Sequence, residues 1–186
     1  MNYFSDYRRI KRLLDFSLAL FGLFLSLPLW LLFSFAILLE DGKPVFYIQE
    51  RVGEGCVIFK AIKFRTMGHK NKKGSRIAVF LRRTALDELP QIINIVKGEM
   101  SFVGPRPLVP QELYVCEELK IRSRVLPGLT GLAQLMAAKN SPVSEKFKYD
   151  ISYIKSQGIF LDIVLILRSF GISLRGRWDR MNKPQA

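Results

Sequence analysis

An almost unbroken apolar run, residues 13–39, constrains the fold of this chain more than any other feature. A straight helix of this length would reach ~40 Å, which exceeds the ~30 Å hydrocarbon core of a bilayer. The run is too long for a cleaved signal peptide, and no small-residue cleavage site follows it. We therefore expect a membrane element near the N-terminus.

The residues alone leave open whether this element crosses the bilayer. Pro28, near its middle, predicts a kink because proline lacks a backbone N–H, and Ser26 can hydrogen-bond a carbonyl freed at the bend. A re-entrant helix that returns through the same leaflet and a tilted span with a tolerated proline both fit. Under the positive-inside rule, the N-terminus is held on the cytoplasmic side by the basic residues before the run: Arg8, Arg9, Lys11 and Arg12.

The net charge of the chain is +13, which implies an anionic partner such as nucleic acid, a phosphorylated metabolite or anionic lipid. An apolar content of 49% is unusual for a nucleic-acid binder. Cys56 and Cys116 show no metal-ligand spacing, so we expect a reduced chain that faces the cytosol. Charged residues between positions 60 and 83 are all basic: Lys60, Lys63, Arg65, Lys70, Lys72, Lys73, Arg76, Arg82 and Arg83.

Beyond residue 40 the pattern predicts an α+β fold that is mainly helical. Two β-prone runs, residues 45–49 and 56–64, flank a glycine-containing turn and predict an antiparallel hairpin. Helical character follows at residues 76–83 and 89–96, and Lys97-Gly98 is typical of a helix C-terminus.

Further helices are expected toward the C-terminus. Residues 111–124 predict an amphipathic helix. The apolar stretch 159–172 is too short to cross a bilayer. It fits either a helix lying at the membrane interface or a buried core helix.

Two rigid segments cannot be regular helix. In residues 101–107, Pro105 and Pro107 fix the backbone on both sides of Arg106, which suits a guanidinium held in place for an anion, or a structural turn. Residues 127–131 form a glycine-rich loop whose backbone N–H groups could meet a phosphate, although a lone glycine loop is a weak signal.

The adjacent carboxylates Asp87 and Glu88 follow the cationic segment and admit two interpretations. Asp87 is a preferred helix N-cap, Glu88 would complement the helix dipole, and Pro90 is tolerated in a first turn. Alternatively, one carboxylate attacks a phosphoryl centre while the other holds Mg²⁺. The pattern alone leaves both open.

Taken together, these residues resemble the small monotopic phosphoglycosyl transferases of the bacterial sugar transferase family, the initiating polyprenyl-phosphate glycosyl-1-phosphate transferases. The similarity runs from Lys11-Arg12 to about residue 170. Five motifs in the family's order carry it: Lys63-Phe64-Arg65-Thr66-Met67, Leu86-Asp87-Glu88-Leu89-Pro90-Gln91, Lys97-Gly98-Glu99-Met100-Ser101, Val103-Gly104-Pro105-Arg106-Pro107 and Pro127-Gly128-Leu129-Thr130-Gly131.

The resemblance implies a re-entrant membrane helix hinged at Ser26 and Pro28, in residues 1–40, and a catalytic domain, residues 41–186, on the cytoplasmic face of the bacterial inner membrane. It also implies a two-step transfer: Asp87 attacks the β-phosphate of a UDP-sugar and releases UMP, and polyprenyl phosphate, expected to be undecaprenyl phosphate, then takes the phosphosugar. Mg²⁺ is the expected cofactor, held by Glu88 with Asp87.

We further expect a set of substrate-binding residues and no nucleic-acid partner, and a homodimer is an allowed oligomeric state. The family commonly has a tryptophan where this chain has Leu132, and an Asn-Gly-Arg-Asn stretch where it has Ala137-Ala138-Lys139-Asn140, so the donor preference is open. A membrane-anchored binding module and a catalytically inactive scaffold are the competing classes. The substrate-binding residues are Lys63, Arg65, Arg83, Arg106, Gln134, Lys139 and Asp150.

Overall fold

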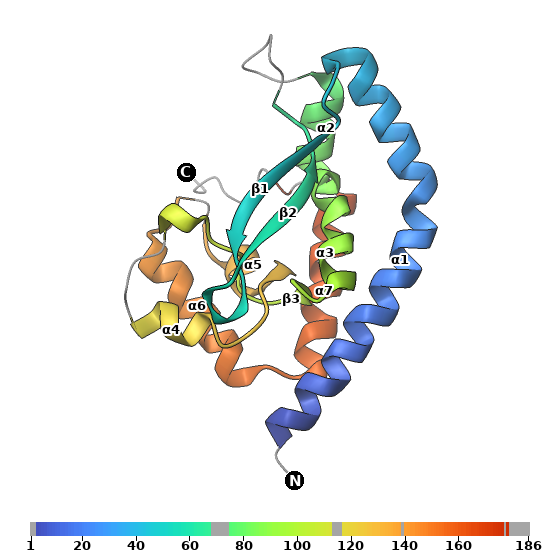
Figure 1. Ribbon diagram of the computed structural model, residues 1–186. Helices are drawn as coiled ribbons and strands as arrows, with labels where there is room; N and C mark the ends of the chain where they lie inside the picture. Colours follow the sequence, from blue (N-terminus) through green and yellow to red (C-terminus); the bar gives the residue numbers. More distant parts are fainter. Residues whose placement is uncertain (1–2, 68–74, 113–116, 139, 177, 179–186) are drawn as a thin grey trace.

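The computed structural model describes residues 3–67, 75–112, 117–138, 140–176 and 178 (Figure 1). The fold is mainly helical with a small antiparallel sheet, as the sequence predicted. Its elements in chain order are α1 (Tyr3–Asp41), β1 (Phe46–Val52), η1 (Glu54–Cys56), β2 (Ile58–Phe64), α2 (Arg76–Thr84), η2 (Leu86–Gln91), α3 (Ile92–Lys97), β3 (Ser101–Val103), η3 (Pro110–Glu112), α4 (Glu117–Arg122), β4 (Gly128–Thr130), α5 (Leu132–Met136), α6 (Val143–Ser156) and α7 (Ile159–Leu174).

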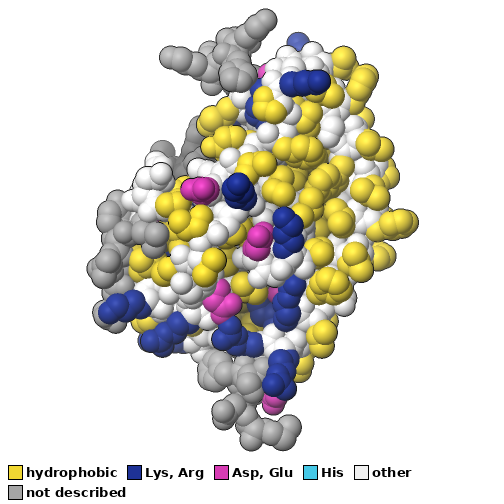
Figure 2. Space-filling view, in the orientation of Figure 1, with side chains coloured by type: hydrophobic (Ala, Val, Ile, Leu, Met, Phe, Trp, Pro, Cys, Tyr) yellow, Lys and Arg dark blue, Asp and Glu magenta, His cyan; other side chains and the backbone are white. Residues whose placement is uncertain are grey.

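Helix α1 is long and apolar enough to cross a membrane, and it runs through Pro28 without interruption. It curves along one side of the molecule (Figure 1), and hydrophobic side chains gather over that side (Figure 2). The Ser26 hydroxyl donates to the carbonyl of Leu23 at 3.2 Å, and Trp30 Nε1 donates to Ser26 Oγ at 3.1 Å. Pro28 leaves the carbonyl of Phe24, four positions before it, without a main-chain N–H donor. The Ser26 hydroxyl does not replace that donor, because it binds the carbonyl of Leu23 instead.

The N-terminal half of α1 is docked by its basic residues. Lys11 Nζ lies 2.7 Å from Asp162 Oδ2 on α7. The Arg12 guanidinium donates to the carbonyls of Ile95 and Val96, at 2.6 and 2.9 Å, and so satisfies the free carbonyls at the end of α3. Basic residues that were expected to set membrane orientation thus also attach α1 to the rest of the protein.

The other end of α1 is held by Arg65. Its guanidinium donates to the carbonyls of Asp41, Gly42 and Lys43 at 2.6 to 3.0 Å, where α1 leaves carbonyls without intrahelical partners. The Ser75 hydroxyl donates to Asp41 Oδ2 at 2.6 Å and links the same end to α2. Both ends of α1 are therefore fixed to the same body.

Strands β1 and β2 form the predicted antiparallel hairpin, with a register from Phe46↔Phe64 to Val52↔Ile58. Gly55 in the turn has a positive φ of 63°, a conformation that favours glycine. The ring of Phe64 is buried between the sheet and α1, where it packs edge-on against Trp30 and Phe33. The hairpin thus packs against α1, and its strand β2 contacts η2.

Strands β3 and β4 pair in parallel, a pairing that the sequence did not predict. The Gly128 N–H donates to the carbonyl of Pro105, and the Gly104 N–H to that of Thr130, each at 2.9 Å. A Cβ on Gly128 would come within 2.0 Å of the Gly104 nitrogen, so the close approach requires glycine. The expectation that the segment 127–131 offers its N–H groups to phosphate is corrected for Gly128, whose N–H is used inside the fold.

Helix α7 combines the two alternatives left open for residues 159–172. One face buries Leu165 in a cluster with Val103, Leu135 and Tyr153. Another face exposes apolar side chains, namely Phe160, Ile163, Leu167, Phe170 and Leu174. The helix is therefore partly core and partly available to an apolar surface. The helix expected at residues 111–124 is shorter, since α4 covers Glu117–Arg122 and residues 113–116 lie outside the described part.

Candidate active site

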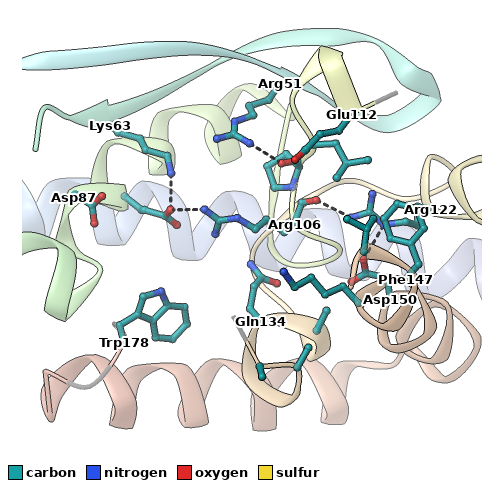
Figure 3. A pocket seen from close by; sticks show the side chains of 18 of the residues that line it. Arg51, Lys63, Asp87, Arg106, Glu112, Arg122, Gln134, Phe147, Asp150 and Trp178 are labelled. Atoms are coloured by element: carbon teal, nitrogen blue, oxygen red, sulfur yellow. Dashed lines mark hydrogen bonds and ion pairs between the residues drawn. The ribbon is translucent and has the colours of Figure 1, made fainter. Parts of the chain in front are cut away.

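A cleft of about 450 Å³ contains the acidic pair (Figure 3). Its walls come from segments far apart in the chain: β1, β2, α2, η2, the residues Arg106, Pro107 and Leu108, η3, α4, α5, α6 and Trp178. Lys and Arg side chains from several of these walls line it, so the cleft suits a ligand with negative charge.

The backbone of the acidic pair is a 3₁₀ turn and not a capped helix start. Helix α2 ends at Thr84, and Ala85 follows in the left-handed conformation with φ 57°. Asp87 then lies inside η2, no side chain caps that element, and α3 begins only at Ile92. The N-cap interpretation of Asp87 was therefore wrong. The turn replaces the expected helix because the left-handed residue redirects the chain just before the carboxylates.

Glu88 is buried and held by two cations. Its Oε1 accepts from Lys63 Nζ at 2.5 Å and from Arg106 Nη2 at 3.4 Å. Burial by itself would raise the pKa of Glu88, but the charges of Arg106 and Lys63 outweigh it and hold the pKa below its ordinary value. Glu88 is accordingly a fixed carboxylate.

Asp87 has the opposite environment. Within the described part of the chain, no other side chain forms a hydrogen bond or ion pair with its carboxylate, which Figure 3 shows on the same side of the cleft as Lys63. Burial, and secondarily the negative charge of Glu88, raises the pKa of Asp87 to about 6. Near neutral pH this carboxylate is mostly ionised, poorly solvated and without an ion-pair partner among the described residues, which are the properties of an available nucleophile.

Four predicted substrate-binding residues do line the cleft: Lys63, Arg106, Gln134 and Asp150. The Arg106 side chain is 46% exposed, so it can contact a ligand while touching Glu88. Asp150 is 3% exposed and forms an ion pair with Arg122, Oδ2 to Nε 2.8 Å. Burial raises the pKa of Asp150, and the charge of Arg122 opposes that rise. The carboxylate of Asp150 is therefore directed at Arg122 of the same chain more than at the cleft.

Of the other three predicted residues, two lie away from the cleft and the third is outside the described residues. Arg65 is 6% exposed and its guanidinium is occupied by the carbonyls at the end of α1. Arg83 is exposed and does not line the cleft, although its carbonyl accepts from the Trp178 N–H at 3.1 Å. Lys139 lies outside the described residues.

Several cleft residues were missed by the sequence reasoning. Trp178, whose indole lies across the cleft from Asp87 in Figure 3, is one of them. Arg82 was noted only as part of the basic run, and its Nη1 donates to the carbonyl of Thr66 at 2.7 Å. No local pattern marks the others, because packing alone brings them here: Arg51, Arg122, Lys146 and Phe147.

The donor set of the cleft fits a magnesium ion of the type shared with a phosphorylated ligand. Among the described residues no group of three or more His, Cys, Asp or Glu side chains comes together, which argues against an all-protein metal cage. Mg²⁺, however, is commonly held by one or two carboxylates together with substrate phosphates and water. Asp87 and Glu88 supply such a pair of carboxylates in the cleft.

Comparison with known proteins identifies related chains over most of the sequence. A family model described as bacterial sugar transferase matches residues 6–176. The exopolysaccharide production protein ExoY of Rhizobium meliloti (strain 1021) is 34% identical over 189 residues, which cover 86% of this chain and 83% of that protein.

Two longer proteins match over part of their length. The undecaprenyl-phosphate glucose phosphotransferase of Komagataeibacter xylinus is 34% identical over 181 residues, covering 84% of this chain and 34% of that protein. The undecaprenyl-phosphate galactose phosphotransferase of Salmonella typhimurium (strain LT2) is 30% identical over 196 residues, covering 90% of this chain and 41% of that protein.

Proposed function

Since the chain belongs to the bacterial sugar transferase family and is a sugar-phosphate transferase, we propose that it moves a phosphosugar from a UDP-sugar to polyprenyl phosphate. The products are UMP and a polyprenyl-diphosphate sugar. The names of relatives that act on undecaprenyl phosphate support that lipid as acceptor, and the name of the exopolysaccharide protein supports a role in glycan assembly.

The observation that carries this proposal is the carboxylate of Asp87, which lies in a cationic cleft, has a pKa raised to about 6 and has no ion-pair partner among the described residues. In the first step an Asp87 oxygen attacks the β-phosphorus of the UDP-sugar. The bond between that phosphorus and the bridging oxygen of the α-phosphate breaks, and UMP leaves with the electron pair. An aspartyl-phosphosugar remains on the enzyme.

In the second step a phosphate oxygen of the lipid attacks the same phosphorus. The bond to Asp87 breaks, the carboxylate is regenerated, and the diphosphate linkage of the product forms. Splitting the transfer in this way lets a soluble donor and a membrane-bound acceptor use one cleft in turn.

Glu88 and its two cations support these steps without forming bonds to phosphorus. Lys63 and Arg106 neutralise Glu88 and lie where they also offset negative charge on the transferring phosphate. A Mg²⁺ ion held by Asp87 and Glu88 would supply further charge neutralisation of the diphosphate. Because the Asp87–Glu88 repulsion contributes to the raised pKa of Asp87, the adjacent pair also keeps the nucleophile reactive.

The position of α1 supports a re-entrant, monotopic membrane attachment with both ends on the cytoplasmic side. Lys11 and Arg12 dock one end, Arg65 docks the other, and Phe33 and Ile37 pack in between. If α1 crossed the bilayer as a simple span, the polar elements packed along its length would have to enter the hydrocarbon region. Entry and return through one leaflet avoids that cost.

The proposed function is tested by UMP release with Asp87→Asn. The purified protein is incubated with Mg²⁺, undecaprenyl phosphate and a panel of UDP-sugars. Asparagine has nearly the same shape but is a poor nucleophile, so we expect UMP release to fall at least ~1000-fold. Glu50→Gln, which removes an exposed carboxylate of β1 away from the cleft, is the matched control and should keep full activity.

Mass spectrometry of the wild-type protein with UDP-sugar alone should detect one phosphosugar adduct on the peptide that contains Asp87. Turnover by Asp87→Asn at the wild-type rate contradicts the covalent mechanism. Absence of UMP release from every sugar tested, together with salt-dependent binding of anionic vesicles, would instead favour a membrane-anchored binding module.

A further inference from the structure

The segment Pro105–Arg106–Pro107 is held in place by its carbonyl oxygens. Proline has no N–H, so two of its three residues cannot donate a main-chain hydrogen bond. Each carbonyl accepts from a different element: that of Pro105 from the Gly128 N–H at 2.9 Å, that of Arg106 from Arg122 Nη2 at 2.8 Å, and that of Pro107 from Arg51 Nη1 at 3.1 Å. The direction of the Arg106 side chain therefore depends on donors outside the segment.

Arg122 is the donor to the middle carbonyl, and it is itself fixed on three sides. It is 7% exposed, its Nε donates to Asp150 Oδ2 at 2.8 Å, and its guanidinium lies 4.5 Å from the centre of the Phe147 ring. Both supporting residues belong to α6, whereas Arg122 ends α4. Figure 3 shows Arg106 between Lys63 and Asp87 on one side and this group on the other.

We infer that Arg122, fixed by Asp150, is a positioning residue for the proposed transfer: it holds the Arg106 backbone so that the Arg106 guanidinium faces Glu88 and the substrate diphosphate. This inference rests on the proposed function for its biological meaning. It assigns Asp150, which we expected to bind substrate, to the support of Arg122. The ion pair also neutralises Arg122, so its charge contributes little to anion binding, unlike that of the half-exposed Arg106.

The forked geometry of arginine is required at position 122. Nε serves Asp150 while Nη2 serves the Arg106 carbonyl, so one planar group reaches two acceptors on different elements. Lysine keeps the positive charge beside Asp150 but ends in one nitrogen and has no planar fork. Arg122→Lys should therefore preserve the ion pair and release the Arg106 carbonyl.

The test is a double-variant cycle read by calorimetric binding of inorganic pyrophosphate, with Mg²⁺, to the detergent-solubilised full chain. We expect Arg122→Lys to weaken binding about 10-fold in the wild-type background, on the scale of a hydrogen bond to a charged group, and less than about 2-fold in the Arg106→Gln background. Arg124→Gln, an exposed neighbour outside the cleft, is the control and should bind as the wild type does. Thermal unfolding of Arg122→Lys should still be one cooperative transition, at a moderately lower temperature, which shows that the variant is folded at the temperature of the binding measurement.

Two results overturn the positioning role: Arg122→Lys binds pyrophosphate as tightly as the wild type, or its loss is equal in both Arg106 backgrounds, as expected for a direct ligand. Turnover separates this inference from the proposed function. A cycle that behaves as expected in a protein that releases no UMP from any UDP-sugar would contradict the transferase proposal and leave the positioning role standing. If the protein turns over, Arg122→Lys should likewise lower kcat/KM more in the wild-type background than in the Arg106→Gln background.

Discussion

Asp87 and Glu88 are neighbours in the chain, yet among the described residues only Glu88 forms ion pairs: Lys63 and Arg106 hold its carboxylate, whereas that of Asp87 has no ion-pair partner. The 3₁₀ turn places the two side chains in different surroundings within one cleft. Their pKa values consequently move apart, up for Asp87 and down for Glu88. Divergent pKa values in a carboxylate pair indicate divided roles, one reactive and one structural.

The first prediction concerns the stability of Asp87→Asn. Because the pKa of Asp87 is about 6 in the folded protein and lower in the unfolded chain, the folded state binds the proton more tightly. The stability that protonated Asp87 contributes is therefore lost as the pH rises through about 6, and it is absent at higher pH. Asparagine avoids this cost, so the variant should unfold at a higher temperature than the wild type at pH 8, with no such gain near pH 4. A lower unfolding temperature at pH 8 would show that the carboxylate makes stabilising contacts.

The second prediction is an acid limb in the rate. In the proposed mechanism only the ionised form of Asp87 attacks phosphorus, so the rate of UMP release should fall as pH decreases through about 6, toward 10-fold per pH unit. The measurement is single-turnover UMP release between pH 5 and 8, at low Mg²⁺ because a bound cation lowers the pKa of its ligands. A flat profile across this range contradicts Asp87 as the titrating nucleophile.

The third prediction separates Glu88 from exposed carboxylates. Glu88→Gln keeps the shape but leaves Lys63 and Arg106 without a buried counter-charge. We expect UMP release to fall about 100-fold or more, and the free energy of unfolding to fall by ~1–3 kcal/mol. Urea unfolding and turnover of Glu50→Gln should both match the wild type. If Glu88→Gln matches Glu50→Gln in UMP release and in urea unfolding, Glu88 contributes neither to the reaction nor to stability.

The fourth prediction tests Arg65, which we expected to bind substrate and which the structure places at the end of α1. Arg65→Ala frees the carbonyls of Asp41, Gly42 and Lys43. The free energy of unfolding should fall by ~2–4 kcal/mol, with the KM for UDP-sugar unchanged in the folded fraction. A large rise in KM without loss of stability would restore the substrate-binding role.

The fifth prediction is topological. After replacement of Cys56 and Cys116 by serine, single cysteines at Asn2 and Gln185 should both be protected from an impermeant thiol reagent in intact cells and react once cells are opened. Labelling of one position from outside would show that α1 spans the bilayer.

Much of the fold follows from local pattern. Three features each depend on a few neighbouring residues. They are the apolar run, the β-prone segments with Gly53 and Gly55 in the turn, and the end of α3 at Gly98, whose φ is 87°. The N-cap interpretation of Asp87 was wrong because it depended only on neighbouring residues. Aspartate before a helical run fits a cap locally, but the left-handed Ala85 redirects the chain into a 3₁₀ turn.

The sequence by itself determined the long apolar helix, the hairpin and the presence of both an acidic pair and an arginine bracketed by prolines. Only the tertiary structure decided which cations meet Glu88, that Arg65 serves α1, and that Arg122 and Asp150 support Arg106. Backbone preferences and hydrophobic periodicity act over a few residues, whereas each of these contacts joins positions more than fifteen residues apart. Such contacts depend on how the elements pack, because a side chain finds its partner only when packing brings the two together.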